Sequence, residues 1–196
     1  MAASTDTKSE RSIEIVRVIK APPEAVFDAF TDPRHISHWW GPHGFTTTTR
    51  RMDVKPGGEW RFIMHGPDGT DYQNLVTYTA VERPKRLQYD HSEPGGPMVP
   101  FHVTVTFEKV SAGTRVTLAM LFASAEIRAN MAKFGAIEGG ENTLHRLEMR
   151  LARAKALSTL KPFEATRTFD APRALVWKAW TEPERLAEWW GPKGCK

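Results

Sequence analysis

The fold class of this chain follows from a seven-residue stretch near its middle, FHVTVTF at residues 101–107. Apolar side chains occupy every second position of the stretch, with histidine or threonine between them. Since successive side chains of a β-strand point to opposite faces, this alternation predicts a strand with one buried and one solvated face. Similar runs at residues 13–19, 46–53, 60–65, 72–81, 87–91 and 116–120 are joined by turn sequences. The sequence therefore predicts one antiparallel sheet of seven strands with a single apolar face.

A helix that covers this apolar face is predicted after the last strand. Apolar side chains recur there at helical spacing in two successive sets, Ile127, Met131, Phe134 and Ile137 and then Leu144, Leu147, Leu151 and Ala154. We expect one long helix that ends near Ala156 and bends near Gly135 or at Gly139-Gly140. Two prolines at residues 22–23 introduce a helix over residues 25–30, and Asp32-Pro33 introduces a shorter one over residues 34–39. The predicted fold class is α+β.

The opening of the chain is repeated near its end. Residues 13–45 recur without a gap as residues 163–195, and both copies contain the rare string WWGP. We therefore divide the chain into a disordered tail at 1–12, a complete domain at 13–160 and a truncated second copy at 161–196. This copy is expected to hold a strand and two helices but no sheet. Its apolar side chains predict loose packing on the first domain or exchange into a second molecule, which would form a dimer.

Composition excludes several classes of protein. The chain has 196 residues, a net charge of +4 and 40% hydrophobic residues, which is ordinary globular composition. No stretch approaches the roughly 18 apolar residues of a membrane span, so we expect no membrane insertion. No run of Lys or Arg exceeds two residues, which argues against nucleic-acid binding. Cys195 is the single cysteine, so no disulfide framework is expected and a reducing cytoplasm fits best.

Several short strings, taken with the order of the predicted elements, resemble a known superfamily. These strings are APP at 21–23, WWGP at 39–42, PGGEWRF at 56–62, GPDG at 66–69 and GAIEGG at 135–140. The chain resembles the START-like (SRPBCC) proteins, which share the helix-grip fold of the birch-pollen allergen. Within them it resembles the branch related to the C-terminal domain of the activator of heat-shock protein 90 ATPase. The resemblance implies a curved sheet that grips a helix around a largely apolar cavity, which many relatives use to hold a lipid, hormone or polyketide-like ligand.

The expected site is therefore a cavity between the sheet and the long helix, binding a small hydrophobic molecule without a cofactor. The side chains expected to line it are Trp40, Phe62, Met64, Tyr78, Phe101, Val103, Met120, Phe134 and Ile137. On the strands, Asn74 and His91 are the polar side chains expected to face it. The WWGP string is predicted to form a loop at the cavity mouth, with at least one indole packed inward.

Two other classes of function stay open. Glu138, Glu141 and His145 are spaced to share one helical face, so Glu141 and His145 could act as an acid/base pair in an enzyme of the cyclase or hydrolase kind. The competing interpretation is an exposed ladder of ion pairs with Arg146 and Arg150. The resemblance also allows a module that contacts a chaperone, which would need an exposed apolar patch.

A metal site is not expected. His35, His38 and His43 form the best cluster, but the second copy has Arg185, Glu188 and Lys193 at the same positions.

Overall fold

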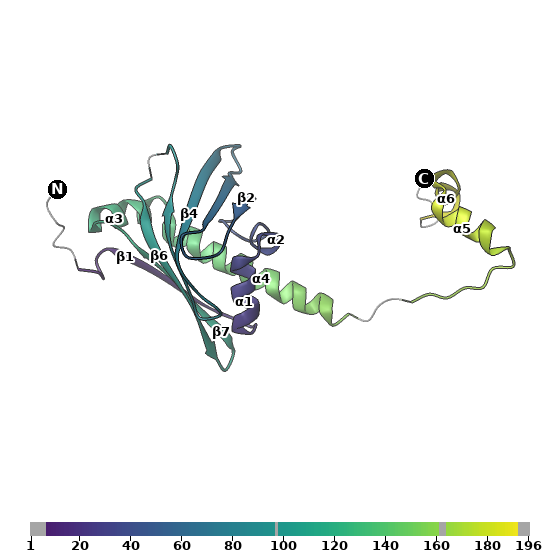
Figure 1. Cartoon of the computed structure of the whole chain (residues 1–196), viewed down its shortest axis with the longest axis horizontal. Coiled ribbons are helices and arrows are strands. Elements are labelled where there is room, and N and C mark those ends of the chain that lie inside the picture. The colour runs from purple at the N-terminus through teal and green to yellow at the C-terminus, as the bar shows by residue number, and fades with distance from the viewer. Residues whose placement is uncertain (1–6, 97, 161–163, 192–196) are drawn as a thin grey trace. The chain divides into compact units, whose positions relative to one another are not determined.

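Seven antiparallel strands form one curved sheet in the computed structural model, which describes residues 7–96, 98–160 and 164–191 (Figure 1). The strands are β1 (Ser12–Ile19), β2 (Thr46–Met52), β3 (Glu59–His65), β4 (Asp71–Glu82), β5 (Arg86–Ser92), β6 (Phe101–Val110) and β7 (Gly113–Leu121). Their order across the sheet is β1-β7-β6-β5-β4-β3-β2. The seven predicted strands are thus confirmed, and β1 closes the sheet by pairing with β7.

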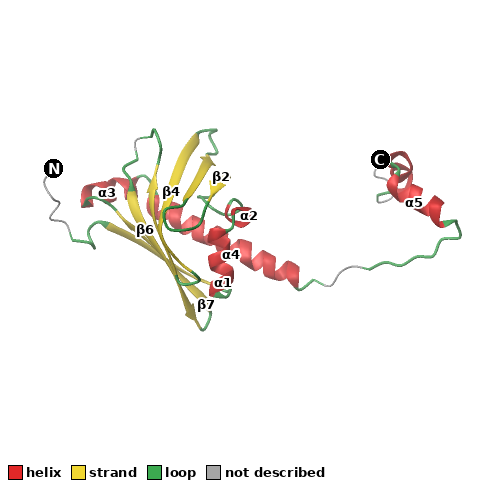
Figure 2. Ribbon diagram, viewed as in Figure 1, coloured by secondary structure: helices red, strands yellow, loops and turns green. Residues whose placement is uncertain are grey.

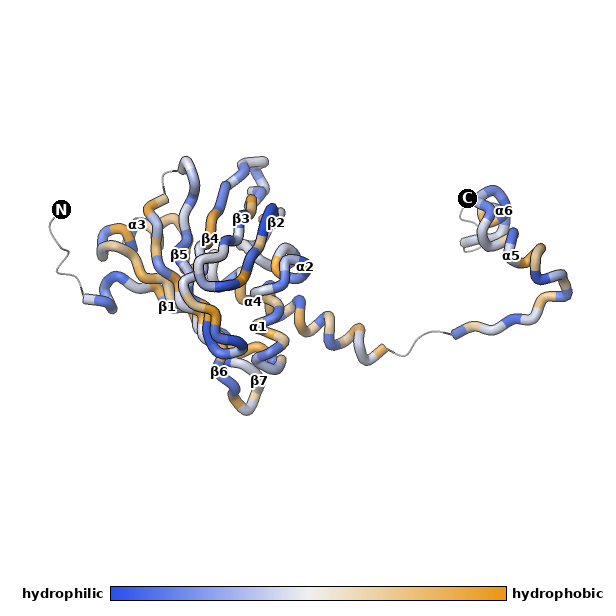
Figure 3. The backbone as a smooth tube through the Cα atoms, in the orientation of Figure 1, coloured by the Kyte–Doolittle hydropathy of each residue, from blue (hydrophilic) through white to orange (hydrophobic). Residues whose placement is uncertain are grey.

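The alternation that predicted the sheet also sets its buried face. On β6, Phe101, Val103, Val105 and Phe107 are all buried, whereas the threonines between them are partly exposed. Figure 3 shows hydrophobic and hydrophilic stretches interspersed within the sheet. The apolar face therefore lies inside the curve of the sheet, where the helices cover it.

Two short helices follow β1 and pack on the sheet. Helix α1 (Pro23–Thr31) begins with a proline in its first turn, and α2 (Pro33–Ile36) begins where the Asp32 carboxylate accepts a hydrogen bond from Arg34 N at 2.8 Å. Helix α2 ends at Ile36 and not at Trp39 as predicted. Residues 37–39 instead form turns, in which His38 N donates to His35 O at 3.1 Å and Trp39 N donates to Ile36 O at 3.2 Å.

The covering helix is broken rather than bent. It consists of α3 (Ala125–Lys133) and α4 (Ala136–Ser158), and the chain turns between them at Gly135 (Figure 2). Gly135 has a φ of 87°, a left-handed conformation that glycine adopts without steric cost. At Gly139-Gly140, the other predicted position for a bend, α4 continues as a helix.

Helix α4 packs on the sheet through its first half. Thr143, Leu144 and Leu147 are buried and Leu151 is partly buried, but Ala154 is exposed. Gly140 allows the close approach of the helix, because a Cβ at this position would collide with Ile15 Cδ1 on β1. In the part of the chain that the structure describes, no helix is both long and apolar enough to cross a membrane.

Residues near the N-terminus are more ordered than predicted. Phe122 N donates a hydrogen bond to Arg11 O at 3.0 Å, and Ser12 already belongs to β1. The disordered tail predicted over residues 1–12 is therefore wrong for Arg11 and Ser12. Residues 1–6 lie outside the described part of the chain.

The chain divides into two compact units, residues 1–159 and 160–196. The second unit contains α5 (Arg173–Thr181) and α6 (Pro183–Trp189), the two helices expected of the repeat. The strand expected before them does not form over the described residues 164–172, and Phe163 lies outside the described part. In the first unit this strand is hydrogen-bonded to β7. Over the described residues 164–191 there is no such sheet, and an unpaired strand would leave its backbone groups without partners.

Candidate functional site

A cavity of about 250 Å³ lies between the inner face of the sheet and the helices α3 and α4. Sheet residues supply one wall, the WWGP loop a second and the break between α3 and α4 a third. The lining side chains and glycines are Trp40, Gly41, Pro42, Met64, Asn74, His91, Met98, Phe101, Val103, Leu118, Met120, Met131, Phe134, Gly135, Ala136, Gly139, Gly140 and Thr143.

Strand register brings the sheet residues of this lining together. Phe101 pairs with His91 across β5 and β6, and Val103 pairs with Met120 across β6 and β7. Because residues directly opposite each other on neighbouring strands share a face, these four side chains form one surface on the inside of the sheet. The cavity wall is thus a direct product of the alternating pattern.

Six of the nine side chains predicted to line the cavity do so: Trp40, Met64, Phe101, Val103, Met120 and Phe134. Phe134 lies at the rim, since it is 88% exposed although it belongs to the lining. Phe62, Tyr78 and Ile137 do not line the cavity, and their prediction as lining residues is wrong.

Phe62 on β3 and Tyr78 on β4 lie in the packed core. Phe62 stacks on Trp60, with ring centroids 3.8 Å apart, and its edge meets Trp40. Tyr78 packs against Tyr89 at 6.1 Å, and burial raises the pKa of the Tyr78 hydroxyl. Both side chains face inward as predicted, but neighbouring rings already fill the space beside them.

Ile137 is replaced in the lining by a stripe of small residues on α4. Ala136, Gly139, Gly140 and Thr143 stand at i, i+3, i+4 and i+7 and therefore share one helical face. Ile137 lies beside this stripe and is 38% exposed. Ile137 was predicted to line the cavity because its side chain is apolar. The cavity instead lies along the part of α4 whose side chains are small or absent. The glycines of the GAIEGG string, residues 135–140, mark this part of the helix in the sequence.

Three further lining residues were missed. Leu118 and Met131 were assigned to the sheet and the covering helix, but only for packing, and Met98 lies in the loop between β5 and β6. Loop residues carry no periodic signal, so nothing in the sequence pattern placed Met98.

The WWGP loop forms part of the cavity wall, as predicted, and both indoles pack inward. Trp39 is fully buried, and its Nε1 donates a hydrogen bond to Ala29 O at 3.1 Å. Trp40 is also buried, and its ring is set edge-on to Trp60 at 5.1 Å. Gly41 has a φ of 103°, so the turn after Trp40 requires glycine.

Arg146 fastens this loop to helix α4. Its Nη1 donates hydrogen bonds to three backbone carbonyl oxygens, those of Gly41 at 2.8 Å, Pro42 at 2.8 Å and Phe45 at 3.0 Å. Desolvation by burial lowers the pKa of the guanidinium. One interpretation of the sequence put Arg146 in an exposed ladder of ion pairs, whereas the structure shows a cation that holds the cavity wall in place.

Three polar side chains interrupt the apolar lining: Thr143, and the two that were predicted to face the cavity, Asn74 and His91. Asn74 is 6% exposed, and its Nδ2 donates to Tyr72 O at 2.8 Å. The His91 ring lies between Phe62 and Phe101, at centroid distances of 6.1 and 5.1 Å, and its Nε2 is 2.8 Å from Asn74 Oδ1. Burial lowers the pKa of His91 to about 4, so the imidazole is neutral near pH 7.

Glu141 and His145 do not form an acid/base pair in the cavity. Glu141 is exposed, and neither residue belongs to the lining. His145 Nδ1 lies 3.2 Å from Arg17 Nη2, and Arg17 Nε donates to Glu148 at 2.9 Å. His145 thus belongs to a partly exposed charged cluster between α4 and β1, and the hypothesis that Glu141 and His145 catalyse a reaction loses its geometric basis.

The histidines considered for a metal site are dispersed. His35 faces Asp32 at 3.9 Å, His43 packs against His145 with ring centroids 5.8 Å apart, and His38 is exposed. Within residues 7–96, 98–160 and 164–191, no three His, Cys, Asp or Glu side chains gather closely enough to hold a metal ion.

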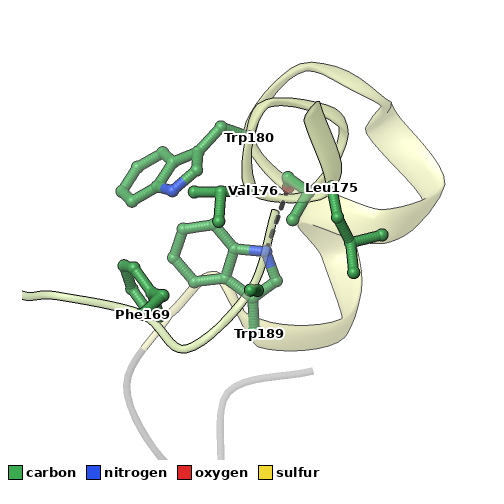
Figure 4. Close-up of a pocket in the computed structure, with 7 residues that line it drawn as sticks. Phe169, Leu175, Val176, Trp180 and Trp189 are labelled. Carbon is green, nitrogen blue, oxygen red and sulfur yellow. Dashed lines mark hydrogen bonds between the residues drawn. The ribbon is translucent and has the colours of Figure 1, made fainter. Parts of the chain in front are cut away.

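The second unit has a smaller apolar hollow of its own, about 230 Å³, which Figure 4 shows. Its lining consists of Phe169, Ala171, Leu175, Val176, Ala179, Trp180 and Trp189. Trp189 Nε1 donates to Ala179 O at 3.1 Å, as Trp39 does to Ala29 in the first unit. The same hydrogen bond from a tryptophan to the preceding helix therefore occurs in both units. In the first unit the corresponding aromatic face is covered, since Phe30 packs edge-on against Phe107 of β6 at 5.2 Å.

Comparison with known proteins finds a matching family and similar solved structures. A protein-family model described as Activator of Hsp90 ATPase homolog 1-like protein matches residues 20–152 and, again, residues 170–196. The chain is similar to a Mycobacterium smegmatis protein of known crystal structure, with 27% identity, a TM-score of 0.69 and coverage of 76% of this chain and 95% of that one. A search among curated proteins finds no match.

Two further solved structures are similar to this chain over most of its length. A Nitrosomonas europaea protein has 26% identity and a TM-score of 0.69, over 76% of this chain and 99% of its own. An Arthrobacter aurescens protein, solved by NMR, has 26% identity and a TM-score of 0.69, over 86% of this chain and 96% of its own. With a helix-grip sheet folded against α4 and a family model that matches most of its length, the chain belongs to the Activator of Hsp90 ATPase homolog 1-like family.

Proposed function

We propose that this protein binds a small apolar molecule in the cavity between the sheet and helix α4. The observation that carries the proposal is the cavity itself, whose lining is apolar except for Asn74, His91 and Thr143. The cavity opens to solvent at its rim, where Phe134 is 88% exposed, so water contacts its apolar lining. A ligand that fills the cavity removes this apolar surface from water, which is favourable.

The volume of the cavity limits the size of the ligand. At about 250 Å³, it is larger than the roughly 150 Å³ cavity that binds benzene in an engineered protein and near the lower end of ordinary ligand pockets, roughly 300 to 1,000 Å³. A ligand of one or two fused rings, or an alkyl chain of similar bulk, fits this range. Contact with a chaperone and catalysis by the chain stay predictions without a site in the geometry.

Equilibrium dialysis with naphthalene tests the proposal. Gly139 lines the cavity, and a Cβ at this position meets only Pro42 Cγ, at 3.4 Å, so a leucine side chain here would extend into the empty space. We expect the full chain to bind naphthalene at a saturable site that Gly139→Leu abolishes. Ala154→Leu, at an exposed position of the same helix, is the matched control and should bind as the wild type does. Equal binding by all three proteins would reject the cavity as the site.

A further inference from the structure

The hydrogen bonds around His91 fix which of its two ring nitrogens carries the proton. Asn74 Nδ2 donates to Tyr72 O at 2.8 Å, which leaves Asn74 Oδ1 as the atom that faces His91 Nε2 at 2.8 Å. An amide oxygen can only accept, so Nε2 must be the protonated nitrogen. In the neutral imidazole the other nitrogen, Nδ1, then holds a lone pair and acts as an acceptor.

This acceptor is unused and open to a ligand. Among the described residues, no group donates a hydrogen bond to His91 Nδ1. His91 is partly exposed and belongs to the cavity lining, and its Nδ1 is not among the described side-chain atoms that are both sealed from solvent and unpartnered, Arg11 Nε and Arg86 Nε. A ligand in the cavity that reaches Nδ1 would supply the missing donor.

The surroundings of the acceptor favour an aromatic ligand without charge. Four of the seven methionines of the chain line the cavity, Met64, Met98, Met120 and Met131. Methionine sulfurs make favourable contacts with ring edges and adapt to different ring shapes. No Asp, Glu, Lys or Arg belongs to the described lining, so an ionic group on the ligand would lose its hydration without gaining a counter-ion.

We propose that the ligand is a neutral aromatic alcohol or phenol, whose rings fill the methionine-lined cavity and whose hydroxyl donates a hydrogen bond to His91 Nδ1. This inference rests on the proposed function and adds the ligand class to it. Asn74 acts as a positioning residue, since its amide holds the imidazole in the tautomer that accepts. A hydrocarbon of the same shape would leave Nδ1 unpaired, and a carboxylate would place its own lone pairs against that of Nδ1.

Three compounds of one ring system separate these possibilities: naphthalene, 2-naphthol and 2-naphthoate, dialysed against the full chain at pH 7. We expect 2-naphthol to bind roughly threefold to tenfold more tightly than naphthalene, which is the factor that one neutral hydrogen bond supplies. We expect 2-naphthoate to bind most weakly. In His91→Phe, 2-naphthol and naphthalene should bind alike. Tyr89→Phe, two residues away on the same face of β5 but outside the lining, should keep the wild-type preference.

A second measurement does not depend on a variant that folds. With ¹⁵N-labelled histidine, the imidazole spectrum of His91 should show an unprotonated Nδ1 whose resonance moves when 2-naphthol is added and stays in place with naphthalene. Equal affinity of the wild type for 2-naphthol and naphthalene, or a protonated Nδ1, would overturn the inference and leave the proposed function intact. Failure of all three compounds to bind would instead overturn the proposed function.

Discussion

His91 is the only Asp, Glu, His, Lys, Arg, Cys or Tyr side chain in the described lining of the cavity, and its position determines how it responds to pH. The strand carries it inward between two phenylalanine rings, and Asn74 is its hydrogen-bond partner. A charged imidazolium at this place would be poorly solvated, so the folded protein prefers the neutral ring. Arg146 is the opposite case, a partly buried group that keeps its charge, and three backbone carbonyl oxygens rather than a carboxylate accept its hydrogen bonds.

We expect the stability of the folded protein to depend on pH through His91. Burial lowers the pKa of His91 from 6.5 to about 4 in the folded chain, so the unfolded chain binds this proton more readily between these pH values. The contribution of His91 to stability is therefore complete above pH 6.5 and decreases as the pH falls toward 4. The loss is at most about 3 kcal/mol, at ~1.4 kcal/mol per pKa unit.

Urea unfolding of the wild type, His91→Phe and His38→Gln between pH 7.5 and 4.5 measures this contribution. His91→Phe should lose less stability on acidification than the wild type. His38 is exposed, so His38→Gln should follow the wild-type profile. Identical profiles for all three proteins would show that the imidazole of His91 is not desolvated in the folded state.

At the scale of elements, α4 shows where prediction from sequence succeeds and where it stops. The strands follow from alternation, since a sheet with one buried face imposes that pattern on every strand. Leu144 and Leu147 were likewise predicted to pack on the sheet, and both are buried. The cavity itself was placed less accurately, because Ile137 was chosen for its apolarity whereas the cavity lies along Ala136, Gly139, Gly140 and Thr143.

The reason is physical. Periodicity reports which face of an element is buried, but it does not report how completely neighbouring side chains fill the space below that face. Phe62 and Tyr78 face inward and still do not line the cavity, because the rings of Trp60 and Tyr89 pack against them. Met98 lies in a loop, where no periodic pattern exists.

The two adjacent glycines of α4, Gly139 and Gly140, should respond oppositely to replacement by alanine. Gly139→Ala should stabilise the protein by about 0.5 to 1 kcal/mol, because alanine is the better helix former and the new Cβ meets only Pro42 Cγ at 3.4 Å. Gly140→Ala should destabilise it by about 1 kcal/mol, because the overlap with Ile15 Cδ1 costs more than the gain in helix propensity.

Urea denaturation of the two variants against the wild type gives both free energies of unfolding. The opposite signs are the informative result, since the two substitutions are chemically identical and one residue apart. Stabilisation by both would mean that α4 stands farther from β1 than the structure shows.

The second unit of the chain exposes most of its large apolar side chains. Its helices α5 and α6 contain no buried residue, and Trp177 is 70% exposed. Its helical corner repeats that of the first unit, in which the equivalent aromatic side chains are covered by the sheet. Apolar surface of this kind favours association. The dimer expected from the repeat therefore stays a prediction.

Removal of residues 160–196 tests whether the second unit causes the chain to dimerise. We expect the shortened chain, residues 1–159, to keep the unfolding temperature of the first unit and to sediment as a monomer, whereas the full chain should associate with increasing concentration. Sedimentation velocity and thermal unfolding of both chains give the comparison. A shortened chain that is less stable and less soluble than the full chain would show that residues 160–196 belong to the fold of the first unit.

The methyl spectrum of the full chain labelled with [methyl-¹³C]methionine shows directly whether the cavity binds a small apolar ligand. Met64, Met98, Met120 and Met131 line the cavity, whereas Met149 lies outside it and is 57% exposed. On titration with naphthalene, we predict that the four cavity methyl resonances shift together and saturate, that the Met149 resonance stays in place, and that Gly139→Leu removes the response. Unchanged cavity resonances at saturating naphthalene, or a shift of Met149 equal to theirs, would show that naphthalene does not bind in the cavity.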